Sequence, residues 1–206
     1  MGLFDFLRDF KNPSSFSGKI DFLIFGLGNP GEKYLQTRHN IGFIVADAFI
    51  KCLTEIKTEK SNDAELIFGV FESRIRVAVV KPLTYMNESG IAVEKIIKKF
   101  SFPLSASLII VDDFHIPTGT IRIRKSGSSG GHNGLKSIEA HVGTGYPRLR
   151  IGIGPLPSDI GIIDFVLGQF TEHDQEMLKE TVPKAVEALK TFINEGVEVT
   201  MNRFNK

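Results

Sequence analysis

The side chains in this sequence that could carry out chemistry lie beside short apolar segments. Asn29 and His39 follow the first such segment, and Asn87 follows a later one. Asp112 ends a third segment, and Asn133 comes directly after a glycine-rich loop. Short apolar runs of this kind are typical of buried strands. Because the carboxyl ends of parallel strands meet at one edge of an open sheet, we expect these side chains to lie close together.

A histidine, a carboxylate and several neutral amides suit the hydrolysis of an ester or amide by an activated water. A neutral imidazole takes a proton from water, while a carboxylate on its other nitrogen fixes the tautomer and stabilises the cation that forms. Amide donors hold the carbonyl and the developing oxyanion. This interpretation makes His39 the general base and Asp112 its partner. Taken singly, each residue could instead serve in a turn or a helix cap.

The loop that carries Asn29 also contains a glycine pattern typical of dinucleotide sites. Residues 26–31 (GLGNPG) have the G-x-G-x-x-G spacing after an apolar segment. In that motif the helix opens among the glycines, so that its N-terminus meets the pyrophosphate. Here the helical period of apolar residues starts only near Ile41. We therefore favour a catalytic loop; a tight connection with an incidental histidine is the other alternative.

A second glycine-rich loop suggests a rival hydrolase. Residues 127–131 (GSSGG) match G-x-S-x-G between a predicted strand and a predicted helix, which would make Ser129 a nucleophile. Asp159 or Asp164, followed by His173, would complete a triad in the right order. A nucleophile elbow is one sharp turn, whereas the small residues 126–131 indicate an open, flexible loop. The serine mechanism remains the weaker alternative.

Composition indicates one globular domain without disulfides. The chain has 206 residues, 42% of them apolar and 24% charged, and its single cysteine, Cys52, excludes an internal disulfide. No apolar run approaches the ~18 residues that a membrane span needs, and we expect a cytoplasmic protein. The five histidines lack the H-x-x-x-H spacing, so we expect no metal.

Net charge is only +1, so a nucleic acid would have to be bound by a local basic patch. The best candidates flank the second glycine-rich loop. Arg122, Arg124 and Lys125 precede it, and Arg148 and Arg150 begin the next predicted strand. Scattered surface charge is the alternative for some of them.

Predicted strands and helices alternate along the chain, with one hairpin inserted. The pattern predicts a single α/β domain of three layers, with a mixed, mostly parallel central sheet flanked by helices. Residues 1–18 are predicted to form an extension, with a short helix and a linker, that precedes the domain of residues 19–206. Strands are expected at 19–25, 64–72, 74–80, 108–111, 119–125 and 149–153, and helices at about 40–57, from about 88, from 132 or 133, and around 178–192.

Four longer motifs resemble bacterial-type peptidyl-tRNA hydrolases. They occur in the family's order between residues 20 and about 195, and they are far more specific than either glycine pattern. One departure is His115, which stands where an acidic residue is more usual. The motifs are residues 28–43 (GNPGEKYLQTRHNIGF), 81–90 (KPLTYMNESG), 130–138 (GGHNGLKSI) and 148–154 (RLRIGIG).

The resemblance implies a monomeric esterase without cofactor or obligate protein partner. It would cut the ester between a peptide and the terminal ribose of peptidyl-tRNA. His39 would be the catalytic base and Asp112 its orienting partner. Asn29 and Asn87 would position the peptide carbonyl and backbone. Asn133 would lie on the tRNA side of the cleft or help to place water, a choice that the resemblance leaves open.

The resemblance also implies residues that bind the two ends of the substrate. Tyr34 and Met86 would line the peptide channel. Arg124, Lys125 and Arg148 would contact tRNA phosphates. A relative that binds RNA without catalysis is the alternative from another functional class, and the joint presence of the histidine, the aspartate and the two asparagines favours the enzyme.

Overall fold

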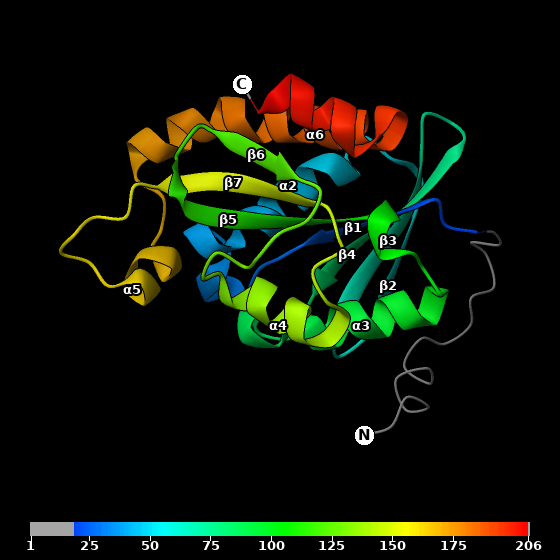
Figure 1. The fold of residues 1–206 in the computed structure, drawn as a ribbon, viewed down its shortest axis with the longest axis horizontal. Coiled ribbons are helices and arrows are strands. Elements are labelled where there is room, and N and C mark those ends of the chain that lie inside the picture. The colour runs from blue at the N-terminus through cyan, green and yellow to red at the C-terminus, as the bar shows by residue number, and fades with distance from the viewer. Residues whose placement is uncertain (1–18, 206) are drawn as a thin grey trace.

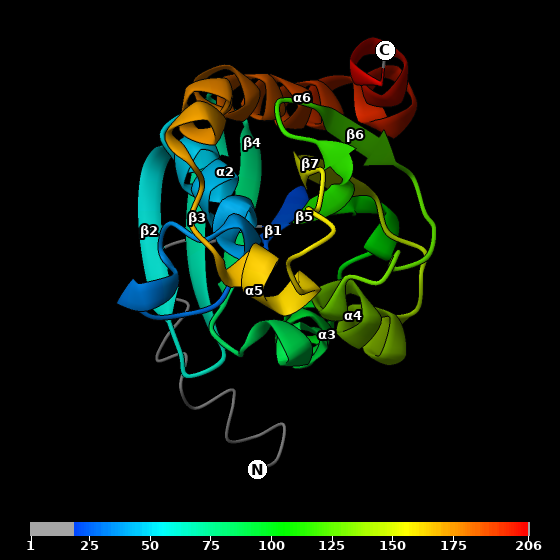
Figure 2. The same ribbon diagram turned by 90° about the vertical axis from the view of Figure 1, so that its left-hand side faces the viewer.

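The protein is a seven-stranded sheet between two helical layers (Figure 1). The computed structural model describes residues 19–205, so the predicted extension 1–18 lies outside the described residues. Helices α2 (Ile41–Ile50) and α6 (Glu172–Phe204) cover one face of the sheet, and α3 (Ser89–Phe100) and α4 (Asn133–Val142) cover the other (Figures 1 and 2). This confirms the predicted three-layer α/β class.

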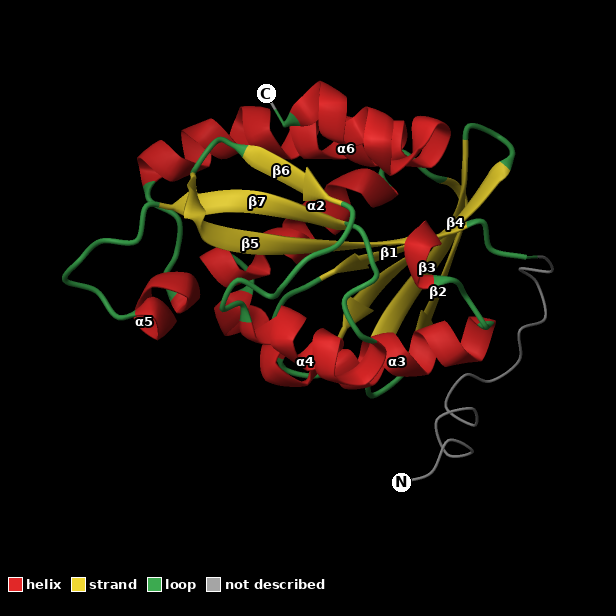
Figure 3. Ribbon diagram, viewed as in Figure 1, coloured by secondary structure: helices red, strands yellow, loops and turns green. Residues whose placement is uncertain are grey.

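The sheet is mixed, with its parallel strands at the centre (Figure 3). Its order is β2-β3-β4-β1-β5-β7-β6. The pairs β1–β4, β1–β5 and β5–β7 are parallel, and the pairs toward both edges are antiparallel. Five of the seven strands therefore run in one direction. The strands are β1 Phe22–Gly26, β2 Thr54–Lys60, β3 Ala64–Phe71, β4 Ile75–Pro82, β5 Ser107–Pro117, β6 Ile121–Arg124 and β7 Arg148–Gly154.

Short helical segments complete the fold between residues 19 and 205. A six-residue helix, α5 (Ile162–Leu167), was not predicted. Four 3₁₀ turns lie at η1 Glu32–Tyr34, η2 Arg38–Asn40, η3 Met86–Glu88 and η4 Leu104–Ala106. No helix among these residues combines the length and the apolar character that crossing a bilayer requires.

Strand β1 shows why the central strands read as continuous apolar runs. Ile24 packs into the core under α2 and α6, whereas Leu23 and Phe25 pack into the core under α3 and α4. All three side chains are fully buried. A central parallel strand with helices on both faces has no side open to water, so neither set of alternating side chains is polar.

The predicted helix 40–57 is wrong in its second half. Helix α2 ends at Ile50, and Thr54–Lys60 forms the edge strand β2, which pairs antiparallel with β3. The segment TEIKTEK alternates polar and β-branched residues, which suits a half-exposed strand. This segment forms a strand because it pairs with the free edge of β3, and the local sequence pattern does not reveal that edge.

The predicted strand 108–111 is too short. Strand β5 continues to Pro117, so Asp112 and Asp113 lie inside a strand and not in the loop after it. Because successive side chains of a strand point to opposite faces, the two aspartates contact different partners. This alternation places Asp112, the predicted partner of His39, and Asp113 on different sides of the strand.

Helix α2 approaches the sheet closely through Gly42. A Cβ atom on Gly42 would lie 2.4 Å from the carbonyl oxygen of Leu27 and 2.6 Å from that of Ile110. Real Cβ atoms do not tolerate such distances, so only glycine fits without a backbone shift. The contact holds the start of α2, and the turn η2 before it, against the ends of β1 and β5.

We therefore expect Gly42→Ala to lower the free energy of unfolding by about 1–3 kcal/mol, the usual range for overpacking a core. Urea unfolding followed by circular dichroism measures the change. Gly145→Ala is the matched control, because a Cβ at Gly145 meets no atom within 4 Å; it should stay within about 0.5 kcal/mol of the parent. Equal effects of the two substitutions would contradict the close-approach argument.

Candidate active site

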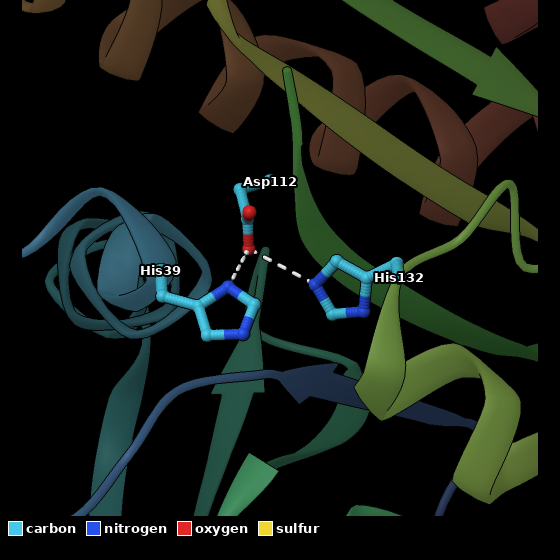
Figure 4. Close-up of side chains that lie close together, drawn as sticks. All are labelled: His39, Asp112 and His132. Atoms are coloured by element: carbon cyan, nitrogen blue, oxygen red, sulfur yellow. Dashed lines mark hydrogen bonds and ion pairs between the residues drawn. The ribbon is translucent and has the colours of Figure 1, made fainter. Parts of the chain in front are cut away.

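The predicted pair of His39 and Asp112 meets in the folded chain. His39 lies in the 3₁₀ turn η2, just before α2, and Asp112 lies in β5. The Nδ1 atom of His39 is 2.8 Å from Oδ1 of Asp112 (Figure 4). Both residues are buried, with exposed fractions of 8% and 2%.

A second imidazole binds the same carboxylate oxygen. His132 Nε2 lies 3.0 Å from Asp112 Oδ1, and its ring lies beside that of His39, with centroids 5.0 Å apart (Figure 4). The sequence had offered His132 only as a possible start of helix α4. It is the N-cap of that helix, and its Nδ1 accepts a hydrogen bond from the Leu135 N–H at 3.2 Å. Its place beside a glycine pair gave no sign of a contact with an aspartate in another strand.

The cap fixes the proton on His132. Because Nδ1 accepts from the backbone of α4, we assign the proton to Nε2, which donates to Asp112. Burial alone would raise the pKa of the Asp112 carboxyl, but the imidazoles of His39 and His132 outweigh it and hold that pKa well below its usual range. The carboxylate is therefore charged at neutral pH and accepts from both rings.

An ionised Asp112 also sets the tautomer of His39. Nδ1 of His39 must carry the proton that it donates to the carboxylate, which leaves a lone pair on Nε2. A neutral imidazole oriented in this way accepts a proton from water, and the carboxylate stabilises the cation that forms. The arrangement can thus activate water as a nucleophile.

His39, Asp112 and His132 also offer three potential metal-ligand atoms within 4.8 Å of one another. Coordination through Nε2 of His132 would need a lone pair on that nitrogen. The proton would then lie on Nδ1, facing the N–H of Leu135, where two donors would oppose each other. These contacts fit a hydrogen-bond network better than a metal site.

Asn29 is held so that its amide nitrogen remains available. Its side-chain oxygen accepts from the Met86 N–H at 2.9 Å. Its backbone N–H donates to the side-chain oxygen of Asn40, and the Asn40 amide nitrogen donates back to the Asn29 carbonyl. Nδ2 of Asn29 makes no hydrogen bond to any residue between 19 and 205, and the residue lines a pocket beside His39.

This pocket, which we call the apolar pocket, has a volume of about 270 Å³. Its walls are apolar or aromatic, and its polar groups are neutral amides and His39. The rings of Tyr34 and Tyr85 meet edge to face at its mouth, with centroids 6.5 Å apart. The pocket is lined by Asn29, Tyr34, His39, Tyr85, Met86, Asn87, Asn133, Ile163, Val166 and Leu167.

A basic pocket of about 340 Å³ lies on the other side of the histidine–aspartate pair. The exposed Arg122 and Arg124 point outward from β6, and neither pairs with any residue in the described part of the chain. Arg150 binds Asp113 at 3.0 Å and the Ser128 carbonyl at 2.9 Å. His115, whose side chain is 63% exposed, joins this pocket and contacts Asp113.

A small pocket of about 50 Å³ at His39, Asp112 and His132 connects the two larger ones. It shares His39 and Asn133 with the apolar pocket and Arg150 with the basic pocket. We call the three together the furrow. Its character therefore changes from apolar to positively charged across the histidine–aspartate pair.

Two predicted phosphate ligands are placed differently from Arg124. Arg148 is fully buried, and its guanidinium donates to the carbonyls of Gly127 and Thr144 at 2.6 and 3.0 Å. Arg148 lines the basic pocket from its buried side, and its hydrogen bonds hold the glycine-rich loop from inside. Lys125 lies outside the basic pocket and pairs with Glu198 at 2.8 Å.

The two glycine patterns do not form the sites that they suggested. After residues 26–31 the chain makes the short turn η1, and α2 begins only at Ile41, so no helix opens within this glycine pattern as the dinucleotide motif requires. Ser129 is buried, and it makes no side-chain hydrogen bond to His173 in the described structure. Neither observation favours a dinucleotide site or a serine triad.

The fold and the furrow define an α/β protein with a buried histidine–aspartate pair between an apolar and a basic pocket. The profile of the peptidyl-tRNA hydrolase family matches residues 23–206. The chain belongs to this family.

Individual relatives agree along nearly the whole chain. A peptidyl-tRNA hydrolase of Phocaeicola vulgatus is 45% identical over 188 residues, which cover 91% of this chain and 100% of the relative. One from Syntrophomonas wolfei is 40% identical over 184 residues, covering 89% and 99%. The crystal structure of the peptidyl-tRNA hydrolase of Acinetobacter baumannii superposes with a TM-score of 0.83 at 33% identity, covering 92% of this chain and 97% of that one.

The double role of His132 can be separated by two substitutions. Asn is a favourable N-cap and can still accept from Leu135, whereas Ala cannot; both remove the imidazole that binds Asp112. We expect His132→Ala to be about 1 kcal/mol less stable than His132→Asn, the usual value of a helix cap. Urea unfolding of the two variants at pH 7 measures the difference. Equal stabilities would show that Nδ1 does not cap α4, and the proton assignment would lose its basis.

Proposed function

We propose that this chain hydrolyses the ester between the peptide and the terminal ribose of peptidyl-tRNA and releases free tRNA. The furrow carries this proposal: a site that activates water lies between a pocket suited to a peptide and a pocket suited to phosphates. A peptidyl-tRNA is a substrate with these two chemically different ends on one ester. Its place in translation would put the enzyme in the cytoplasm, and we expect it to act as a monomer.

In the proposed mechanism His39 is the general base. Its Nε2 takes a proton from a water molecule as the water oxygen attacks the ester carbonyl carbon. Asp112 holds the Nδ1 proton and stabilises the imidazolium that forms. When the tetrahedral intermediate collapses, the bond from the carbonyl carbon to the ribose oxygen breaks. His39 returns its proton to that oxygen, so the products are a peptide carboxylic acid and a free ribose hydroxyl.

The neutral amides would position the acyl group. Asn29 presents its Nδ2 toward the apolar pocket, because its side-chain oxygen is already bound to Met86. Asn87 lies on the exposed wall of the same pocket, where it can bind a peptide backbone. Asn133, the first residue of α4, lines both the apolar and the small pocket and is placed to contact water or the ribose. Tyr34 and Met86 supply apolar walls for the peptide.

The basic pocket would bind the phosphates of the tRNA. Arg122 and Arg124 have no acidic partner within residues 19–205 and face the pocket together with Arg150. A planar guanidinium group can donate two parallel hydrogen bonds to two oxygens of one phosphate, which the ammonium group of lysine cannot do. The buried Arg148 would act indirectly, by holding the loop that forms one wall.

The two catalytic hypotheses differ in the side chain that is indispensable. We expect His39→Ala to lower kcat for an N-blocked aminoacyl-tRNA by at least the ~10²–10⁴-fold that a general base contributes. Ser129→Ala should keep most of the activity. Release of free tRNA over time measures both. Loss of activity in the serine variant alone would favour the serine mechanism, and a parent protein that binds tRNA but releases nothing would favour the non-catalytic relative.

Salt dependence tests the basic pocket. We expect binding of tRNA to weaken steeply with salt, and Arg124→Gln to reduce the slope of log Kd against log salt by about one phosphate contact. Lys125→Gln is the matched control, because Lys125 has the same charge, is adjacent in sequence and lies outside the pocket. A larger effect of the lysine substitution would place the phosphate contacts elsewhere.

A further inference from the structure

Arg38 is the neighbour of His39 in the turn η2, and it is buried away from the histidine–aspartate pair. Its guanidinium carbon lies 4.6 Å from the ring centre of Phe165 and 5.6 Å from that of Phe170. Nη2 binds the carboxylate of Asp174 at 3.0 Å. One buried cation thus contacts three residues of a single segment, which runs from α5 into α6.

The backbones of the two segments are also joined. The N–H of Arg38 donates to the carbonyl of Gly168 at 3.0 Å, and Thr37 forms an antiparallel bridge with Gln169. A Cβ on Gly168 would lie 3.1 Å from Nη1 of Arg38, so the approach is close. The residues just after α5 are therefore fastened to the turn that carries His39.

Helix α5 has few other contacts that fix its position. It has only six residues and stands apart from the two helical layers (Figure 1). Ile162 and Ile163 are 51% and 68% exposed, and only Phe165 and Val166 of this helix reach the core under α2 and α6. Yet Ile163 and Val166 line both the small pocket and the apolar pocket. The contacts of Phe165 and Phe170 with the Arg38 guanidinium thus add to core packing in holding this wall of the furrow.

We propose that Arg38 is a positioning residue that sets α5 as the wall of the furrow against His39 and thereby determines how tightly the acyl chain binds. The proposal rests on the proposed function, because it assigns the apolar pocket to the peptide. Asp174 explains why a cation suits this site: the aspartate also caps α6 through Thr171, so the ion pair ties α5, α6 and η2 at one point.

Lysine cannot replace arginine here. The guanidinium is flat, so it stacks on aromatic rings, and its separate nitrogens reach Asp174 and the Phe165 carbonyl. Lysine would keep the charge for Asp174 but lose the stacking. Arg38→Lys therefore loosens α5 without leaving a buried carboxylate unpaired.

The experiment compares two substrates that differ only in the acyl group: a tRNA carrying N-acetylglycine, and the same tRNA carrying an N-acetylated peptide rich in leucine. For Arg38→Lys we expect KM for the leucine-rich substrate to rise on the order of tenfold, as for lost contacts in an apolar pocket. KM for the glycine substrate and kcat for both should stay within about twofold of the parent, because the histidine–aspartate pair is untouched.

Two further variants make the result specific. Arg203→Lys is the matched control, because Arg203 also pairs with a carboxylate, Glu195 at 2.8 Å, but on α6 and outside the furrow; it should change neither KM. Ile163→Ala removes part of the wall itself. Its side chain is so exposed that folding does not depend on it, and it should raise the KM for the leucine-rich substrate selectively.

Three outcomes would overturn the proposal while the parent enzyme remains active. They are an unchanged KM for the leucine-rich substrate in Arg38→Lys, an equal rise in KM for the two substrates, and a fall in kcat with no change in KM. The last would mean that Arg38 acts through His39. A parent protein that hydrolyses neither substrate would instead overturn the proposed function, so the two failures are distinguishable.

Discussion

The site depends on one buried carboxylate that accepts hydrogen bonds from two imidazoles. Asp112 is 2% exposed, and a charge at such a position is costly unless it is compensated. His39 and His132 supply that compensation at 2.8 and 3.0 Å. In return the charge determines the proton on each ring, with His39 left as an acceptor toward the small pocket and His132 kept as a donor by its helix cap. The protonation of both imidazoles therefore follows from the hydrogen bonds that compensate the buried Asp112 carboxylate.

The scaffold places this anion by means of two simple geometric rules. Strand alternation turns Asp112 toward the imidazoles and Asp113 toward Arg150, so adjacent carboxylates bind different partners. Direct contact between a glycine of α2 and the backbones of β1 and β5 holds the histidine turn at the end of the sheet. A helix that carried a side chain at Gly42 would stand farther away and would move His39 with it.

Positive charge is divided between the interior and the surface of the basic side. Arg148 is buried, and its guanidinium donates hydrogen bonds to the carbonyls of Gly127 and Thr144. Burial lowers the pKa of this guanidinium. Arg122 and Arg124 remain outside with no acidic partner in the described chain. Arg38 is also buried, and its guanidinium contacts the segment that forms the wall of the apolar pocket. Buried arginines thus shape the walls, while exposed arginines are left for a ligand.

The sequence by itself determined the layered α/β class, the central strands and the pairing of His39 with Asp112. Apolar runs indicate buried strands from local residues alone, and the four long motifs identify the histidine and the aspartate. Only the tertiary structure decided the rest. Thr54–Lys60 became a strand because β3 offered a free edge. His132 joined the site, and the Arg148 guanidinium bound backbone carbonyls, because burial and hydrogen-bond partners come from segments distant along the chain. Residue type and spacing state what a side chain can do, whereas its neighbours in space decide which of those roles it takes.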